Sequence, residues 1–171
     1  MTSDENTGRH RQVREVVEGL ARIEDGIEAY RATGAALFVP YSLALLGTTY
    51  GVAGRAAEGL RFLAEALDAV NATGEHWFEP ELHRLKGELL RLASSDRGAT
   101  EACFLRAMTI AREQNAKLWE LRAATSLAGV WAEQGRRAES HDLLAPLYGW
   151  FTEGFDTADL KDAEALLDEL S

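Results

Sequence analysis

The sequence has too few cysteines for disulfides or structural zinc, and it has no apolar run long enough to cross a membrane. Cys103 is the one cysteine among 171 residues, so it has no partner for an internal disulfide and no cysteine cluster for zinc. No stretch of about 18 uncharged apolar residues occurs, and residues 1–10 lack the apolar segment of a secretory signal. These absences predict a cytoplasmic protein that does not bind membranes.

Basic residues and proline are also scarce. Eighteen lysine and arginine residues are outnumbered by 28 aspartate and glutamate residues, which gives a formal net charge of -10 at pH 7. Nucleic-acid phosphates require a basic contact surface, so we expect no nucleic-acid partner. With three prolines and 46% apolar residues, the composition is that of one ordinary domain that can bury a core without a disulfide or a metal.

The sequence does contain an internal repeat. Residues 19–47 align with residues 59–87 without a gap, and ten of these 29 positions are identical. A further shift of 41 residues aligns Asn115, Trp119 and Ala128 with Gly74, Phe78 and Gly87. A fixed period of this length is typical of stacked structural repeats.

Each repeat predicts a pair of helices, because apolar residues recur at helical spacing on both sides of a short break. Gly34, Gly74 and Asn115 are the expected helix ends, since these residue types adopt the left-handed conformation that follows a helix. Pro40 and Pro80 come six residues later and predict the first turns of the next helices. No alternating strand pattern competes, so the predicted class is all-α. The expected helices lie near residues 11–33, 37–52, 55–73, 77–93, 98–114, 118–134, 137–149 and 158–170.

Residues at matching places in the repeats predict how the helices pack. Gly47, Gly87 and Ala128 are small, and we expect the two helices of each pair to cross closely there. Phe38, Phe78 and Trp119 also recur at one place, and we interpret them as core between the repeats.

The C-terminal segment predicts a helix that covers the end of the repeats. Its apolar residues fall on one stripe, and Thr157 is the expected N-cap. The stripe consists of Leu160, Ala163, Leu167 and Leu170. From Glu153 to the end, the chain contains seven acidic residues and one lysine, which gives a charge of -6. We interpret this segment as a polar outer face.

The repeated residues follow a pattern of a bulky residue, Leu-Gly and an aromatic residue, then small and apolar residues in the second helix. The first repeat has Leu43, Leu46-Gly47, Tyr50, Gly54, Gly59, Leu63 and Ala66-Leu67. This pattern resembles the tetratricopeptide repeat, although the unit of 40 or 41 residues exceeds the usual 34, and Lys86, Thr100 and Ser140 depart from the pattern. The resemblance implies a right-handed α-solenoid over residues 11–152, with a flexible terminus at 1–10 and an acidic capping helix at 153–171.

Three further blocks narrow the resemblance: Glu81–Leu90, Leu121–Leu127 and Tyr148–Phe155. They are similar to the C-terminal repeat region of large bacterial signalling proteins, which join a nucleotide cyclase or a DNA-binding regulator to an ATPase. This implies a non-enzymatic scaffold for protein–protein interaction, acting as a regulatory or sensor region. The implied partner is a protein or peptide, including the ATPase and cyclase domains of such a protein.

No residue cluster predicts a catalytic, cofactor or metal site. Glu75, His76, Glu79, Glu81 and His83 form the one group of histidines and carboxylates, which we interpret as surface residues at a helix start. Cys103 lies on an apolar helix and is interpreted as a buried small residue rather than a reactive thiol.

The remaining candidate is the concave groove that the resemblance places on the first helix of each pair. The implied groove residues are Tyr41, Ala44 and Thr48, then Glu81, Arg84, Glu88 and Arg91, then Arg122, Thr125 and Gly129. Two interpretations stay open. In the first, the charged residues from Glu81 to Arg91, spaced three or four apart, pair with one another along their helix. In the second, Arg84, Arg91 and Arg122 bind an acidic peptide.

Two questions about partners also stay open. The alternative to a scaffold is a receptor that takes a peptide or small molecule into the groove. A homodimer, joined through an uncovered apolar end of the solenoid, is a further expectation.

Overall fold

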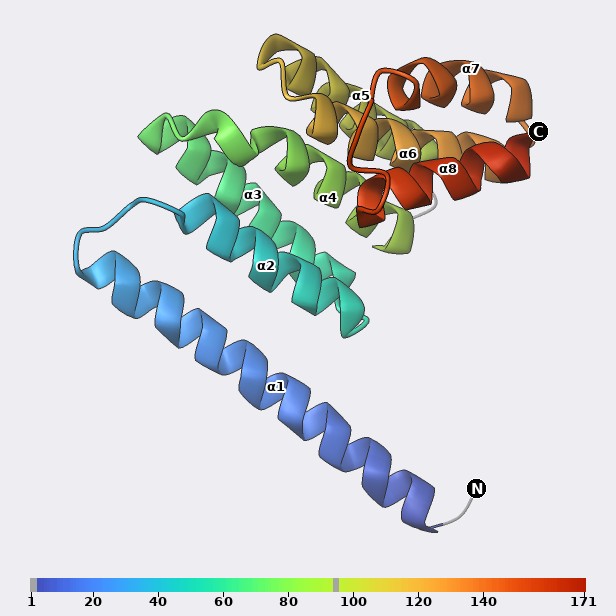
Figure 1. Cartoon of the computed structure of the whole chain (residues 1–171). Helices are drawn as coiled ribbons and strands as arrows, with labels where there is room; N and C mark the ends of the chain where they lie inside the picture. The colour runs from blue at the N-terminus through green and yellow to red at the C-terminus, as the bar shows by residue number, and fades with distance from the viewer. Residues whose placement is uncertain (1–2, 94–95) are drawn as a thin grey trace. The chain divides into compact units, whose positions relative to one another are not determined.

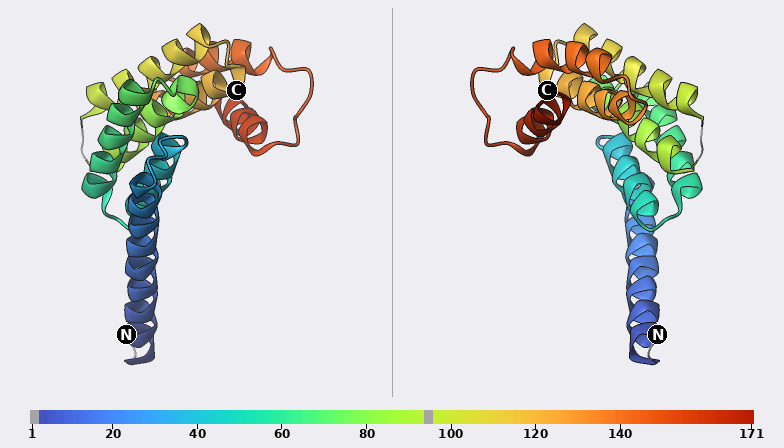
Figure 2. Two further views of the ribbon diagram at one scale, coloured as in Figure 1. Left: turned by 90° about the vertical axis from the view of Figure 1, so that its left-hand side faces the viewer. Right: turned by 90° about the vertical axis from the view of Figure 1, so that its right-hand side faces the viewer.

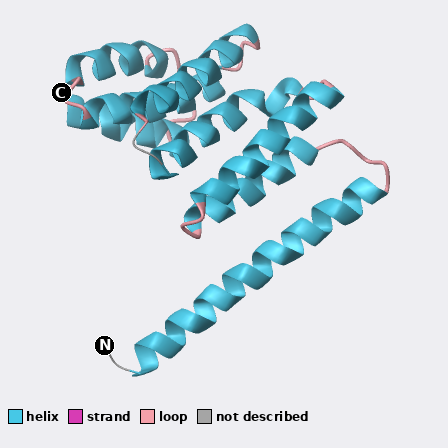
Figure 3. Cartoon of the chain, turned by 180° about the vertical axis from the view of Figure 1, so that it is seen from behind, coloured by secondary structure: helices cyan, strands magenta, loops and turns pink. Residues whose placement is uncertain are grey.

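The computed structural model is all-α, as predicted (Figures 1 and 3). It describes residues 3–93 and 96–171, and side chains from residue 18 onward. This part of the chain contains eight α-helices, one short 3-10 helix over His76–Phe78 and no strand. The α-helices are α1 (Ser3–Ala32), α2 (Val39–Val52), α3 (Ala56–Thr73), α4 (Glu79–Ala93), α5 (Arg97–Glu113), α6 (Lys117–Glu133), α7 (Arg137–Tyr148) and α8 (Ala158–Leu170).

The helices form two compact units. Unit 1 spans Met1–Glu75 and unit 2 spans His76–Ser171. In unit 1, α2 packs on α3 and α1 packs on α2. In unit 2, successive helices from α4 to α7 pack on one another, and α8 packs on both α6 and α7. Figure 2 shows the loop between α7 and α8 extending away from the helices before α8 returns to them.

The predicted helix ends and starts are confirmed. Gly34, Gly74 and Asn115 all have positive φ angles, of 82°, 73° and 55°. Pro40 lies in the first turn of α2, where its missing amide hydrogen costs nothing. Helix α1 begins at Ser3, earlier than the predicted start near residue 11, and so includes most of the segment expected to be flexible. No proline interrupts the sequence of this stretch.

The predicted close crossings occur in all three helix pairs. A Cβ atom added to Gly47 of α2 would lie 2.9 Å from the carbonyl oxygen of Gly59 in α3. A Cβ at Gly87 of α4 would lie 2.6 Å from the Phe104 ring in α5. In the third pair, the Ser140 hydroxyl of α7 donates a 2.6 Å hydrogen bond to the carbonyl of Ala128 in α6. Small residues are therefore required where the helices touch.

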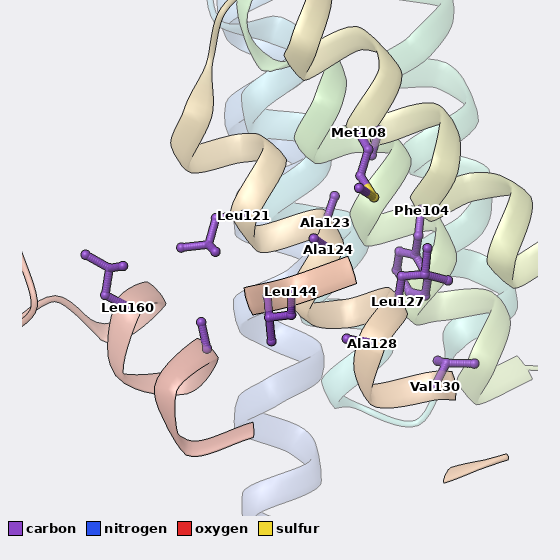
Figure 4. Packing of buried hydrophobic residues seen from close by; sticks show 12 residues of the cluster. Phe104, Met108, Leu121, Ala123, Ala124, Leu127, Ala128, Val130, Leu144 and Leu160 are labelled. Atoms are coloured by element: carbon purple, nitrogen blue, oxygen red, sulfur yellow. The ribbon is translucent and has the colours of Figure 1, made fainter. Parts of the chain in front are cut away.

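A cluster of twelve buried residues lies in unit 2 (Figure 4). Phe104, Leu121, Leu127 and Leu144 are fully buried in it, and Leu160 of α8 joins them with 2% exposure. Complete burial of side chains this large stabilises unit 2 by about 1.5–3 kcal/mol each. Helix α8 therefore belongs to the core of unit 2.

The predicted aromatic core is confirmed in part. Phe78 is buried, and its ring meets the half-buried Trp119 ring edge-on at a centroid distance of 5.6 Å. The prediction for Phe38 is wrong, because this residue is 50% exposed. Phe38 precedes α2 with a φ angle of 63°, and this backbone conformation sets the direction of its side chain.

The C-terminal helix has the predicted apolar stripe but a different start. Leu160, Ala163 and Leu170 are buried. Thr157 occupies the N-cap position, yet its hydroxyl makes no capping bond and donates to the carbonyl of Gly154 at 2.7 Å. In the described ranges, no helix combines the length and the apolar character that crossing a membrane would need.

Candidate functional site

A polar pocket of about 440 Å³ lies among helices α4, α6 and α8 of unit 2. Residues spaced three or four apart share one helix face, so each helix directs a short set of side chains into the pocket. The lining residues are Arg84 and Glu88 from α4, Arg122, Thr125 and Ser126 from α6, and Asp159 and Asp162 from α8. Four of the predicted groove residues, Arg84, Glu88, Arg122 and Thr125, are therefore brought together.

Arg84 is held rigidly by carboxylates of its own helix. Its Nε and Nη2 atoms donate to the two carboxylate oxygens of Glu81, at 2.9 and 2.7 Å. Its Nη1 atom lies 3.3 Å from Glu88 Oε1, which also accepts a 2.7 Å bond from the Ser126 hydroxyl. Burial disfavours the charged guanidinium, but the hydrogen bonding to Glu81 and the negative charges of Glu81, Glu88 and Asp159 together outweigh it, so the pKa of Arg84 is raised. Arg84 is therefore a fixed cation.

Arg122 connects α6 to α8. Its Nε atom donates a 2.6 Å hydrogen bond to Oδ1 of Asp159, which lies 37 residues further along the chain. Its Nη1 atom lies 3.5 Å from Oε1 of Glu81, and its guanidinium stacks 4.9 Å from the centre of the Trp119 ring. The cation is thus held by two carboxylates and an aromatic face.

Glu81 lies beneath the pocket and joins both arginines. Its side chain is only 7% exposed, and one of its carboxylate oxygens, Oε1, accepts from Arg84 and from Arg122. A buried carboxylate requires such partners, because an unpaired charge there would be strongly destabilising. Glu81 therefore serves the site as a support for both arginines and is not itself open to a ligand.

The charges of the site bear on both interpretations of the groove. All three pairs expected along α4 are present: Glu81 with Arg84, Arg84 with Glu88, and Glu88 with Arg91. Two arginines at the pocket are opposed by four carboxylates, those of Glu81, Glu88, Asp159 and Asp162, so the local charge is 2 - 4 = -2. Pairing within the chain is confirmed. An acidic ligand would have to displace Asp159 from Arg122, whereas a basic group meets an attractive field.

The other predicted groove residues lie elsewhere. Arg91 pairs with Glu133 at 3.3 Å and lines a separate cavity of about 220 Å³ in unit 2. Tyr41 and Thr48 belong to α2 of unit 1. Tyr41 lines an apolar groove there, and the Thr48 hydroxyl donates to the carbonyl of Ala44 at 3.0 Å.

Sequence reasoning missed three residues of the pocket: Ser126, Asp159 and Asp162. Ser126 lies four residues after the predicted Arg122, so helical spacing alone was a usable signal. Asp159 belongs to the acidic C-terminal segment, which was interpreted as a polar outer face. No local pattern shows that α8 turns this aspartate toward Arg122.

The histidine and carboxylate group behaves as a helix start. His76 Nδ1 lies 2.7 Å from Glu79 Oε2, and His83 Nε2 lies 3.9 Å from Glu79 Oε1. Burial lowers the pKa of His83, although Glu79 opposes the shift. Among the residues with described side chains, no group of three or more histidines, cysteines or carboxylates is placed to hold a metal ion.

Cys103 has the features of a structural residue. It is half-buried, and burial raises the pKa of its thiol. A raised pKa keeps the thiol protonated near neutral pH, and the protonated form is a poor nucleophile.

Comparison with known proteins gives one informative likeness. No family model matches the chain. Over 121 residues, it is 29% identical to an uncharacterized protein of Rhizobium meliloti (strain 1021). The match covers 71% of this chain and 12% of that protein, so the chain spans about one eighth of the length of the curated relative it matches.

Proposed function

We propose that this chain is a non-enzymatic scaffold for protein–protein interaction, built from tetratricopeptide-like hairpins in a right-handed solenoid. The support for the hairpins is that α2–α3, α4–α5 and α6–α7 meet through small residues at matching sequence positions. The proposed setting is the regulatory or sensor region of a bacterial signalling protein or transcriptional regulator. The likeness to a short part of a much longer bacterial protein supports a role as one region among several.

The observation that carries the proposal is the polar pocket among α4, α6 and α8. Helices α4 and α6 each begin a hairpin, α8 packs beside α6, and side chains of all three line one surface, as a concave binding groove requires. Thr125 and Ser126 add hydroxyl groups, and none of the ion pairs among the described residues involves Asp162. A partner segment with a basic side chain fits this surface best, because it would pair with Asp162 while the existing bridges stay intact.

Site-specific photo-crosslinking in the native bacterial host tests this proposal. A photoreactive phenylalanine analogue at Thr125, inside the pocket, is expected to capture a protein partner. The same analogue at Asp142, whose side chain is 85% exposed on α7, is the matched control. The captured protein should disappear in a chain that carries Asp162→Lys. Equal capture at both positions, or capture unaffected by Asp162→Lys, would contradict the proposal.

A receptor for a small molecule or peptide is the second candidate. The specific observation in its favour is the pocket volume of about 440 Å³, which falls within the range of small-ligand sites. A ligand present at a hundred times its dissociation constant stabilises the folded state by about 2.7 kcal/mol. A thermal-shift screen of cationic metabolites is therefore expected to find a stabilising compound if this candidate is correct, and no shift would favour the scaffold.

A further inference from the structure

Helices α1 and α3 are counterparts under the 40-residue offset of the sequence. Four positions along one face of α3, two of which meet Gly47 of α2, have direct equivalents on α1. Gly19, Ile23, Gly26 and Tyr30 of α1 correspond to Gly59, Leu63, Ala66 and Val70 of α3. On α3 this face is fully covered, with exposures of 0% for Leu63, 0% for Ala66 and 1% for Val70.

The equivalent face of α1 is open. Tyr30 is 40% exposed, Gly26 is exposed, and Ile23 is half-buried. A Cβ atom added to Gly19 or Gly26 would meet nothing within 4 Å. On α3, by contrast, the Gly59 carbonyl would lie 2.9 Å from a Cβ at Gly47. Glycine inside a helix costs stability unless close packing requires it, and nothing packs on these two glycines in the described residues.

An apolar groove of about 230 Å³ runs beside this open face, between α1 and α2. Its walls are Ile23, Gly26, Ile27 and Tyr30 from α1, and Val39, Tyr41, Ser42 and Leu45 from α2. The adjacent side of α1 is the attached one, where Leu20 and Ile27 are 2% and 8% exposed and Arg31 pairs with Glu65 of α3. Helix α1 is thus fixed to unit 1 along one face and uncovered along another.

The lengths of the helices lead to the same conclusion. At 1.5 Å per residue, the 30 residues of α1 extend about 45 Å, whereas the 14 residues of α2 extend about 21 Å. Figure 1 shows α1 continuing past the end of α2. An uncovered helical segment of this kind is marginal in water, so a further packing partner would stabilise it.

We propose that the Gly19–Tyr30 face of α1 is a seat for an additional amphipathic helix, which packs on α1 as α2 packs on α3. The chain itself shows the required chemistry three times. Helices α2, α4 and α6 each bring a small residue to the crossing point, and these residues are Gly47, Gly87 and Ala128. The occupant therefore has a leucine-rich stripe with glycine or alanine at the position that meets Gly19. The inference rests on the repeat proposed above but not on the polar pocket of unit 2.

The occupant is a helix from outside the described residues rather than one from a second copy of the chain. In the described ranges, the helices with a small crossing residue already pack on a partner helix of their own hairpin. Gly47 of α2 meets Gly59 of α3, and Gly87 of α4 meets Phe104 of α5. A second copy would have to open a hairpin, and expose residues such as the fully buried Leu63, to supply the helix.

A grafted chain tests the seat. A copy of residues 37–55, which includes α2 and its following turn, replaces residues 1–15 of the full chain, so that the copied turn leads into Val16 as Arg55 leads into Ala56. We expect a higher Tm and amide exchange in α1 that is at least ten times slower. The matched control carries Gly47→Leu in the copied segment only, which prevents the close crossing and should abolish both effects.

Substitutions in the otherwise unchanged grafted chain complete the test. Gly19→Leu is expected to remove the gain in Tm, whereas Ala21→Leu, on an exposed position two residues away, should preserve it. A graft that gives no gain, or a gain that survives the Gly47→Leu copy, would overturn the proposal. So would a native chain that sediments as a dimer and becomes monomeric with Gly19→Leu, because a second copy would then be the occupant. Photo-crosslinking at Thr125 is independent of these results and reports on the proposed function alone.

Discussion

The last helix of unit 2 and the first helix of unit 1 differ in how they complete the hairpin beside them. Helix α8 buries Leu160, Ala163 and Leu170 against α6 and α7. Helix α1 buries Leu20 and Ile27 but leaves Tyr30 exposed beside an apolar groove. A repeat leaves an apolar face that only a neighbouring helix can cover. Unit 2 supplies that cover itself, whereas the described residues of unit 1 do not.

Removing α8 should break this difference and has the largest expected effect. Deletion of residues 156–171 removes Leu160 and Leu170 from the core, which corresponds to about 3–6 kcal/mol for two buried leucines. The shortened chain is expected to unfold at lower urea concentration and to self-associate through the exposed cluster. Urea unfolding and analytical ultracentrifugation measure both effects. A shortened chain that stays monomeric and equally stable would show that α8 does not cover unit 2.

Truncating one large side chain in each unit compares their cores directly. Phe104→Ala removes a fully buried ring from unit 2 and is expected to cost about 3–5 kcal/mol of unfolding free energy. Tyr30→Ala, at a position 40% exposed in unit 1, should stay within about 0.5 kcal/mol of the native chain. Denaturant midpoints of the two variants give the comparison. Similar losses would mean that the open face of α1 is covered in solution.

A pH series tests the ion pairs that fix α6. Glu120 is 2% exposed, and although its burial alone would raise its pKa, hydrogen bonds from Lys117 and Arg112 lower it. A carboxylate with a lowered folded-state pKa contributes stability above its unfolded pKa of about 4.3, and loses it as the pH falls through the folded value. Glu120→Gln is therefore expected to cost about 1 kcal/mol at pH 7.

The difference between the native chain and Glu120→Gln should shrink progressively below pH 4. Glu133→Gln is the control, since the Glu133 side chain is 66% exposed. Urea unfolding at several pH values measures both variants. A difference that stays constant down to pH 2 would show that the charge of Glu120 contributes nothing to folding.

Glycine substitutions should have effects of opposite sign in the two units. Gly26→Ala on the open face of α1 is expected to stabilise the chain by about 0.5–1 kcal/mol, because a helical glycine with free space around it only costs entropy. Gly87→Ala should destabilise unit 2, since the new Cβ would lie 2.6 Å from the Phe104 ring. Thermal unfolding distinguishes them, and the same sign for both would contradict the assigned packing.

Local chemistry explains why so much of the hairpin architecture was predictable from the sequence. Asn115 was identified as a helix end because its residue type tolerates the left-handed backbone it adopts. Gly47 and Gly87 were identified as crossing points because they recur at one position of the repeat. Four of the ten residues proposed for the groove, Arg84, Glu88, Arg122 and Thr125, line one pocket because helical spacing places them on facing surfaces.

The features that the sequence did not predict depend on contacts between distant residues. Asp159 pairs with Arg122 only because the loop after α7 returns α8 to α6, and no periodicity specifies that path. Phe38, the residue directly before α2, has a positive φ angle, and its side chain is exposed. Its recurrence with Phe78 and Trp119 gave no sign of this difference.

The central claim is that a partner protein with a basic side chain binds the pocket among α4, α6 and α8. The affinity of the partner captured at Thr125, measured for the native chain, Asp162→Lys and Asp142→Lys, tests it most directly. We predict at least tenfold weaker binding for Asp162→Lys, because the new charge repels the basic group, and unchanged binding for Asp142→Lys on the exposed surface of α7. Equal affinities for all three chains would contradict the account.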